Sequence, residues 1–378
     1  MIAIAHLTSA HPREDTRIFH KMCRTLEANG FEVALIVADG KSDETLHSIA
    51  IHDVGASLGR RDRILHAPGR VFEKALELNA GLYHLHDPEL LPIGLKLKEL
   101  GKRVIFDSHE DVPRQMLSKP YLNKPTRWVI AQVLRIYEFW AYRQLDGVIA
   151  ATPFIRDKFL KLNLFTVDIN NYPILSELSS TTCWSARRPE VCYVGGIAEI
   201  RGIVDVVEAM GHLRSAGRLN LAGCFSDASL EQRLQDHAGW QRVNPLGFVD
   251  RAGVRDVLAR SMAGLVTFHP LPNHIDAQPN KMFEYMSAGI PVIASDFPLW
   301  REIIAGNDCG LLVDPLNSEA IARAIDYLIT HPKDAERMGR NGRQAVERRY
   351  NWDHQSQKLS DFYNRVLSLS SPEHALEA

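Results

Sequence analysis

The sequence predicts an α/β protein built from two parallel-sheet domains, and three observations support that prediction. Short apolar runs alternate with longer amphipathic stretches from end to end, which is the pattern of strands and helices in parallel α/β folds. A chain of 378 residues exceeds one ordinary core and fits two domains of roughly 150–200 residues each. Residues 170–190 interrupt the alternation with Ser, Thr and Pro, so they indicate a domain boundary.

The first domain is expected at residues 1–172. Its short apolar runs predict strands at residues 2–7, 32–37, 82–86, 103–106 and 147–150. Between the first two strands the pattern predicts a helix over residues 16–29. Gly30 follows it, in the position of a C-cap glycine.

A linker at residues 173–190 is expected to lead into a second domain at residues 191–350. The predicted strands of this domain are residues 191–194, 219–222, 264–267, 291–294 and 310–313. Helices are predicted at residues 201–213, 319–330 and 334–349. An amphipathic segment at residues 352–367 has no strand after it, so residues 351–378 are expected to form a trailing helix and tail.

Composition excludes several classes of protein. With 45% hydrophobic and 24% charged residues the chain is not expected to be disordered, and 44 Lys+Arg against 46 Asp+Glu argue against a nucleic-acid partner. No apolar run approaches the ~18 residues of a membrane span, and no signal peptide is readable at the N-terminus. Five scattered cysteines without a C-x-x-C predict neither disulfides nor a zinc finger, which favours a cytoplasmic location.

The most informative stretch for chemistry is residues 269–298. Asp276 precedes a predicted helix whose first residues are expected to be Pro279 and Asn280. Lys281 would lie in the first turn of this helix and Glu284 one turn further on. A helix N-terminus and a lysine together favour phosphate oxygens, and Glu284 could accept hydrogen bonds from two ribose hydroxyls. The alternative is a capped helix with a surface Glu and Lys.

This segment, NKMFEYMSAGIPVIAS, resembles the signature of the retaining glycosyltransferases of family 4, in the GT-B superfamily. The resemblance implies two Rossmann-like domains facing across a cleft, with a C-terminal helix that crosses back to the first domain. The family carries two acids separated by seven positions, here Asp276 and Glu284. It implies that Glu284 holds the donor ribose and that Asp276 lies beside the transferred sugar. The usual first acid is Glu, so Asp276 is a departure with shorter reach.

Two further segments of the second domain resemble the family. Residues 194–202, VGGIAEIRG, are similar to its G-R-L-x-x-x-K-G, in which Arg and Lys bind the diphosphate. Arg201 falls on the Lys position, whereas Gly196 falls on the Arg position and loses a cation. The pair Gly195 and Gly196 after a strand would let the backbone approach an anion closely. The resemblance leaves Arg201 and Lys281 as the expected diphosphate cations. Phe248 lies in the loop that usually recognises the base.

The first domain carries similar motifs. The run DSHE places His109 after a predicted strand, at the edge where open α/β sheets bind ligands, and the family gives that histidine a role at the donor sugar. His84 and His86 would share one face of a strand, but two ligands are too few to identify a metal site. The His-Pro loop at residues 8–17 is expected to meet the acceptor, and Asp15 in it is alternatively a helix cap.

Two features bear on metal and membrane. The sequence contains no D-x-D, so the leaving diphosphate is expected to be neutralised by Arg201, Lys281 and helix N-termini without a metal or other cofactor. Residues 119–143 carry five basic residues against one acid, with two tryptophans and three tyrosines. This segment is expected either to lie in a membrane interface or to face the core with snorkelling Lys and Arg.

The resemblance implies a retaining glycosyltransferase of the polysaccharide-biosynthesis branch. Its expected donor is a UDP- or GDP-linked sugar, and its expected acceptor is a carbohydrate or a lipid-linked molecule. It is expected in the cytoplasm, with a place on the inner face of the membrane left open. Two alternatives stand beside it: a non-catalytic nucleotide-sugar-binding subunit, favoured by Gly196 and Asp276, and a sugar-nucleotide epimerase of the same fold.

Overall fold

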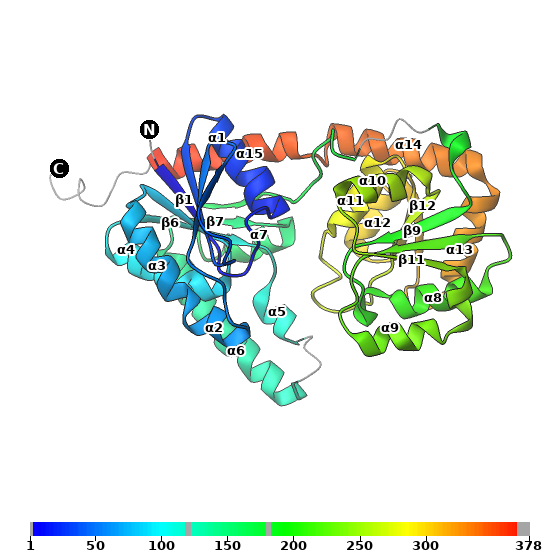
Figure 1. Ribbon diagram of the computed structural model, residues 1–378, viewed down its shortest axis with the longest axis horizontal. Coiled ribbons are helices and arrows are strands. Elements are labelled where there is room, and N and C mark those ends of the chain that lie inside the picture. Colours follow the sequence, from blue (N-terminus) through cyan, green and yellow to red (C-terminus); the bar gives the residue numbers. More distant parts are fainter. Residues whose placement is uncertain (1–2, 118–121, 179–182, 369–378) are drawn as a thin grey trace. The chain divides into compact units, whose positions relative to one another are not determined.

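The computed structural model describes residues 3–117, 122–178 and 183–368 of the chain. It divides into two compact units, Met1–Asn171 with Asp353–Ala378, and Tyr172–Trp352 (Figure 1). Each unit has a largely parallel sheet flanked by helices, which confirms the predicted α/β class of two parallel-sheet domains. The described part of the expected linker, residues 173–178 and 183–190, belongs by its contacts to the second unit.

The first sheet has the strand order β3-β4-β2-β1-β5-β6-β7-β8. All its neighbouring strands are parallel except β3 and β4, which form an antiparallel pair at one edge. Its strands are β1 (Ala3–Leu7), β2 (Glu32–Val37), β3 (Glu44–Leu46), β4 (Ile49–Asp53), β5 (Leu82–Leu85), β6 (Arg103–Ser108), β7 (Gly147–Ala150) and β8 (Thr166–Asp168).

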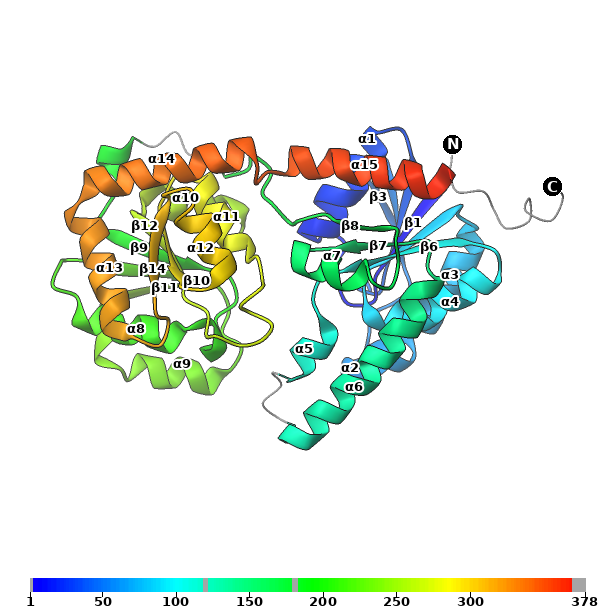
Figure 2. The ribbon, with the colours of Figure 1, turned by 180° about the vertical axis from the view of Figure 1, so that it is seen from behind.

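The helices of the first unit cover both faces of this sheet (Figures 1 and 2). They are η1 (Thr16–Cys23), α1 (Arg24–Ala28), α2 (Arg60–Leu65), α3 (Ala67–Leu78), η2 (Pro88–Leu90), α4 (Leu91–Glu99), α5 (Val112–Leu117), α6 (Lys124–Ala141), η3 (Tyr142–Gln144), α7 (Pro153–Phe159) and α15 (Trp352–Ser368). The last of these, red in Figure 2, returns to the first unit, where the Tyr363 hydroxyl lies 2.6 Å from His84 Nδ1.

The second sheet is entirely parallel, with the order β11-β10-β9-β12-β13-β14. Its strands are β9 (Glu190–Val194), β10 (Arg218–Ala222), β11 (Val243–Gly247), β12 (Ala263–Val266), β13 (Val292–Ser295) and β14 (Gly310–Val313). Its helices are η4 (Trp184–Ala186), η5 (Glu199–Arg201), α8 (Ile203–His212), α9 (Ala228–Gln235), η6 (Ala238–Arg242), α10 (Arg251–Arg260), α11 (Asn280–Ser287), α12 (Pro298–Ile304), α13 (Ser318–Thr330) and α14 (Pro332–Arg348).

The ten predicted strands are confirmed with end shifts of at most two residues, because buried parallel strands are continuous apolar runs. Four strands were not predicted: β3, β4, β8 and β11. Three of them are edge strands, which pair on one side only, and β4 separates β3 from the rest of its sheet. Edge strands tolerate polar residues and even a proline, such as Pro245 in β11, so their apolar pattern is weak.

The predicted helix over residues 16–29 forms as two consecutive pieces. Its first half, η1, is π-helical, and α1 continues it. Asp15 caps the start, since its carboxylate accepts from the backbone N–H of Arg17 at 2.8 Å and of Ile18 at 2.9 Å. Gly30 ends it with a φ of +85°, a conformation that suits glycine. The capping alternative for Asp15 is therefore confirmed.

The strand order fixes where each unit can bind a ligand. β1 lies between β2 and β5 in the first sheet, and β9 lies between β10 and β12 in the second. The chain passes from β1 to β2 on one side and later from β4 to β5 on the other side of β1. It likewise passes from β9 to β10 and later from β11 to β12. In open α/β sheets, ligands bind at the carboxyl ends of the strands where the order reverses in this way. Among the described residues, no helix is long and apolar enough to cross a membrane.

Candidate functional site

α11 carries Lys281 and Glu284 to the candidate site of the second unit. Its first residue is Asn280, and Pro279 is the N-cap, with an extended backbone at φ −67° and ψ 130°. The expectation that Pro279 is itself helical is therefore wrong by one residue. The fixed φ of proline suits the extended residue just before a helix, and Lys281 still falls in the first turn as predicted.

The Lys281 ammonium is buried with very little around it to neutralise its charge. The residue is 7% exposed, and within the described part of the chain its Nζ has no hydrogen-bond partner. Nζ lies 3.5 Å from the centre of the Tyr193 ring, a cation–π contact. Burial, and then the charge of Arg201, lower the pKa of Lys281 well below its ordinary value. Such a group is stabilised by an anion.

The Gly195–Gly196 turn lies over this lysine, directly after β9. A Cβ on Gly195 would be 3.6 Å from Cε and 3.7 Å from Nζ of Lys281, so the ammonium lies next to that turn. Gly195 has a φ of +108°, which side chains with a Cβ rarely adopt. The turn therefore lets backbone approach the cation closely, at the carboxyl end of the strand where the connections diverge.

Arg201 fills the space that Gly196 leaves. Its Nη1 donates to the Gly196 carbonyl at 3.1 Å, and a Cβ on Gly196 would lie only 2.7 Å from Nη1. The guanidinium carbon of Arg201 and Nζ of Lys281 each lie 5.7 Å from the centre of the Phe268 ring. The structure thus brings Gly195, Gly196, Arg201 and Lys281 together around one small region of positive charge.

Glu284 is paired with an arginine that the sequence analysis missed. Arg251 Nη1 donates to Glu284 Oε1 at 2.8 Å, and Arg251 Nε donates to Glu177 Oε1 at 2.7 Å. Arg251 is the first residue of α10 and follows the loop that carries Phe248. A basic residue just after that loop was the available signal. The pairing of Arg251 with an acid 33 positions away could not be predicted from the sequence.

Two predicted site residues lie on loops of the second unit. Phe248 follows β11 and is 79% exposed, so its ring is available for stacking. Asp276 lies half-buried in the connection between β12 and α11. That connection is fixed on both sides of Asp276, since His269 Nε2 lies 2.7 Å from Asp205 Oδ2 and the Trp300 indole donates to the Ala277 carbonyl at 2.7 Å.

His109 belongs to the first unit, where it follows β6. Its Nε2 lies 3.0 Å from Oδ2 of Asp107, a fully buried carboxylate that also forms a two-pronged ion pair with Arg17 at 2.7 and 2.8 Å. Burial alone would favour the neutral acid. The charges of Arg17 and His109 overcome it and hold the pKa of Asp107 well below its ordinary value. A fixed carboxylate thus orients the His109 ring.

The His-Pro loop lies next to His109. The rings of His11 and His109 have centroids 5.1 Å apart. Asp87 anchors the loop by accepting from the Thr8 hydroxyl and the Ser9 backbone N–H, both at 2.7 Å. Against the effect of burial, Asp15 and Asp87 raise the pKa of His11. This edge of the first sheet therefore gathers polar side chains from the ends of β1, β5 and β6.

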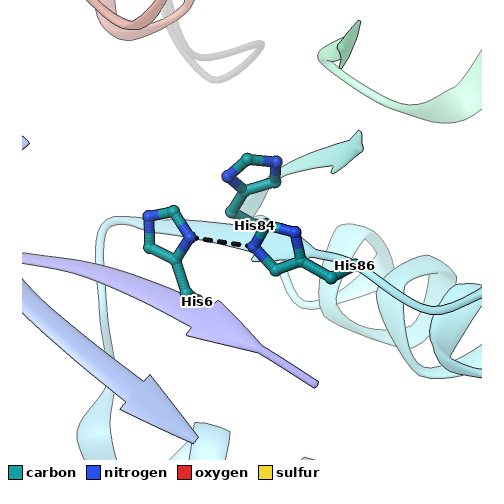
Figure 3. A group of neighbouring side chains, drawn as sticks. All are labelled: His6, His84 and His86. Carbon is teal, nitrogen blue, oxygen red and sulfur yellow. Dashed lines mark hydrogen bonds between the residues drawn. The ribbon is translucent and has the colours of Figure 1, made fainter. Parts of the chain in front are cut away.

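His84 and His86 share one face of β5 and its end, as predicted, and His6 of β1 joins them (Figure 3). His6 Nδ1 and His86 Nε2 lie 2.9 Å apart, within hydrogen-bond distance, and all three rings are buried. Burial first, and then neighbouring histidines, lower the pKa of His6 and His84 well below 6.5, and burial also lowers that of His86. The cluster is a neutral polar core under α15.

Among the described residues, two groups of side chains have metal-ligand spacing, with the ligand atoms of each group within 4.8 Å of one another. They are His6, His84 and His86, and His86, Asp107 and His109. The expectation of too few ligands is therefore wrong, because His6 supplies a third from a neighbouring strand. As the groups stand, His6 and His86 bind each other, Tyr363 binds His84, and Arg17 holds Asp107.

Two family models match the chain, one in each unit. "Glycosyltransferase Family 4" matches residues 16–166, and "Glycosyl transferases group 1" matches residues 182–345. Among curated relatives, a glycogen synthase of Mycobacterium tuberculosis is 23% identical over 299 residues, 70% of each chain. A GDP-mannose-dependent alpha-(1-6)-phosphatidylinositol monomannoside mannosyltransferase of the same organism is 35% identical over 79 residues, 21% of this chain and 20% of that one.

Solved structures match nearly the whole chain. Sucrose-phosphate synthase from Thermosynechococcus elongatus superposes with a TM-score of 0.80 at 20% identity, covering 98% of this chain and 100% of that one. Anabaena HepE in complex with UDP-glucose gives 0.72 at 16% identity, covering 97% and 100%. The fold is therefore that of the GT-B glycosyltransferases. With both family models, the chain belongs to the glycosyltransferases of the family 4 type.

The histidine cluster predicts a loss of stability in acid. The folded protein keeps His6, His84 and His86 neutral, whereas the unfolded chain takes up protons near pH 6.5. The free energy of unfolding should therefore fall as pH drops below 6.5, by up to about 1.4 kcal/mol per pH unit for each histidine. His11, whose pKa is raised, acts in a different range: its contribution is fully present below pH 6.5 and is lost as pH rises through its folded pKa.

Urea titrations between pH 7.5 and 5.5 measure this dependence. His84→Gln should remove roughly a third of the cluster's slope, whereas His331→Gln, at an exposed position, should leave it unchanged. A free energy of unfolding that stays level across this range would contradict the neutral cluster.

Proposed function

We propose that the chain is a retaining, metal-independent glycosyltransferase that moves a sugar from a UDP- or GDP-linked donor to an acceptor hydroxyl. Its acceptor would be a carbohydrate or a lipid-linked molecule in cell-surface polysaccharide or glycoconjugate biosynthesis. We further propose a cytoplasmic location, at the inner face of the membrane. One observation supports the donor part: Lys281 and Arg201 lie together at the glycine turn that follows β9. The Nζ atom of Lys281 is buried there and has no hydrogen-bond partner among the described residues.

The donor class has support from relatives as well as from charge. HepE is solved with UDP-glucose, and the mannosyltransferase relative is named for GDP-mannose and a phosphatidylinositol acceptor. In this chain Lys281 and Arg201 would bind the diphosphate, Glu284 would accept from the ribose hydroxyls, and exposed Phe248 would contact the base.

In the proposed transfer the bond from the anomeric carbon to the diphosphate oxygen breaks, and a bond from that carbon to the acceptor oxygen forms on the same face. The acceptor proton passes to the leaving phosphate oxygen. Arg201 and Lys281 would stabilise the charge that develops on the diphosphate, and a preorganised cationic site suits that role. Asp276 would lie beside the transferred sugar, and His109 would act at the donor sugar with its ring held by Asp107.

Of the alternatives, the non-catalytic subunit rests on Gly196 and Asp276. The first departure is offset, because the Arg201 guanidinium reaches the place beside Gly196. The second departure, Asp276 in place of Glu, still supplies a carboxylate. No feature of the site favours the epimerase over transfer.

A thermal-shift screen with UDP-, GDP-, ADP- and dTDP-sugars tests the donor assignment, because a ligand that binds the folded state raises the melting temperature. A UDP- or GDP-sugar should give the shift, and Glu284→Ala should weaken its binding by roughly 10- to 150-fold, since each charged hydrogen bond contributes about 1.5–3 kcal/mol. Glu177→Ala is the matched control, because it removes the other carboxylate on Arg251. Equal losses in both variants, or no shift with any donor, would contradict the proposal.

Arg201→Ala should lower turnover by roughly 100-fold or more, because the developing charge on the diphosphate loses a cation. Arg233→Ala is the control, since it removes a nearby exposed arginine that pairs with Glu199. The double variant Gly196→Arg/Arg201→Ala returns a cation to the same space, so part of the turnover should return. Steady-state kinetics with the donor identified in the screen measure these effects. Near-normal turnover in Arg201→Ala would refute the role.

Transfer should survive exhaustive EDTA treatment with little loss. A Mg²⁺ ion near Arg201 and Lys281 would meet like charges instead of the carboxylate ligands that it prefers. Activity measured before EDTA, after it and with added Mg²⁺ or Mn²⁺ provides the check. If EDTA abolishes transfer and a divalent ion restores it, the metal-free diphosphate site is wrong and Asp276 and Glu284 become candidate ligands.

A further inference from the structure

The exposed face of α6 is unusually apolar. Six large apolar side chains of this helix are each between 49% and 71% exposed: Trp128, Val129, Val133, Ile136, Phe139 and Trp140. The residues that α6 buries are instead Ala131, Glu138 and Ala141. For Trp128 and Trp140, the expectation of a core-facing segment is therefore wrong. Residues 119–121 of that segment lie outside the described residues.

These side chains share one side of the helix. Positions 128, 132, 136, 139 and 143 follow steps of three or four residues, and 129, 133, 136 and 140 form a parallel row beside them. The two tryptophans are twelve residues apart, so they are separated by about 18 Å along the helix axis. In both views the N-terminal part of α6 extends beyond the sheet of the first unit (Figures 1 and 2).

The charged side chains of α6 on or beside this face are positive. Lys124, Arg135 and Arg143 are exposed on or beside it. The one acid of α6 is Glu138, which is buried and accepts from Lys158 Nζ at 2.6 Å. A hollow of about 530 Å³ lies next to α6. Its lining includes Arg135 and Phe139 of α6 together with Lys158 and Lys161, and also Asp157, which pairs with Arg156.

We propose that this face of α6 docks the enzyme on an anionic lipid bilayer, with the helix lying in the interface plane. Apolar side chains would enter the acyl boundary, tryptophans would lie at the headgroup level, and the flanking cations would meet lipid phosphates. A second copy of the chain fits this face less well, because pairing it with itself would bring Arg135 and Arg143 of both copies into one interface, while the one acid of α6, Glu138, is buried. The inference deepens the proposed membrane location and does not depend on the donor site.

Sedimentation with sucrose-loaded vesicles tests the proposal. The full chain should bind phosphatidylglycerol/phosphatidylcholine vesicles at least roughly tenfold more tightly than pure phosphatidylcholine vesicles, and less tightly as salt rises. The double variant Val133→Asp/Ile136→Asp should lose roughly tenfold or more of that binding. Leu316→Asp, at a 56% exposed leucine of the second unit, is the matched control and should bind as the parent does. Arg135→Ala/Arg143→Ala should lose the preference for phosphatidylglycerol.

A second measurement uses variants that do not change the charge of the protein. Brominated acyl chains should quench the tryptophan fluorescence of the bound protein, and Trp128→Phe/Trp140→Phe should lose most of that quenching while still sedimenting. Circular dichroism and the donor-induced thermal shift should be unchanged in the α6 variants, which separates a failure of docking from a failure of the donor site. The proposal is overturned if the parent chain ignores phosphatidylglycerol vesicles, if Leu316→Asp loses as much as the α6 variant, or if light scattering shows a dimer that the α6 variant breaks without changing vesicle binding.

Discussion

A buried ammonium without a hydrogen-bond partner in the described structure is the constraint around which the second unit's candidate site is organised. Lys281 would be costly to keep charged in a protein interior, and its pKa is lowered accordingly. The neighbouring Arg201 adds to that cost instead of offsetting it. The nearest features are an aromatic ring and a glycine turn, neither of which neutralises charge. Positive charge concentrated where strands end suits an anionic ligand.

The first unit handles buried charge in the opposite way. Asp107 is fully buried, yet Arg17 pairs with it through two hydrogen bonds and also donates to the Ile169 carbonyl at 2.8 Å. The charge is satisfied internally, so this ion pair ties β6 to η1 and orients His109 without any ligand. The histidines behind it are neutral and bonded to one another and to Tyr363. The first unit thus neutralises the charge of Asp107 from within, whereas the described part of the second unit leaves Lys281 Nζ without a hydrogen-bond partner.

Strong local patterns in the sequence predicted most of the fold. Ten of the strands appeared as apolar runs, while β3, β8 and β11 lie at edges where such a run is not required, and β4, IAIHD, was missed because polar residues end it beside the edge. For the site, the segment around Lys281 was predictable because helix start, cation and acid lie within a few residues. His6 joins His84 only through the register of β1 against β5, and Arg251 reaches Glu284 only because the folded chain brings residues 33 positions apart into an ion pair. Contacts of that kind depend on tertiary structure, which no local pattern contains.

Gly196 illustrates why a departure from a family motif is best judged by where charge lies. Removing an arginine at this position would leave a gap in a cationic site. Here the guanidinium of Arg201 turns back to the Gly196 carbonyl, within 2.7 Å of where a Cβ at position 196 would stand. A larger residue there would compete with Arg201 for the same space, so the glycine and the arginine suit each other. With glycine at this position, Arg201 and Lys281 are the two cations that lie at the turn. Burial and the charge of Arg201 lower the pKa of Lys281, so an anion held at this turn would raise that pKa again.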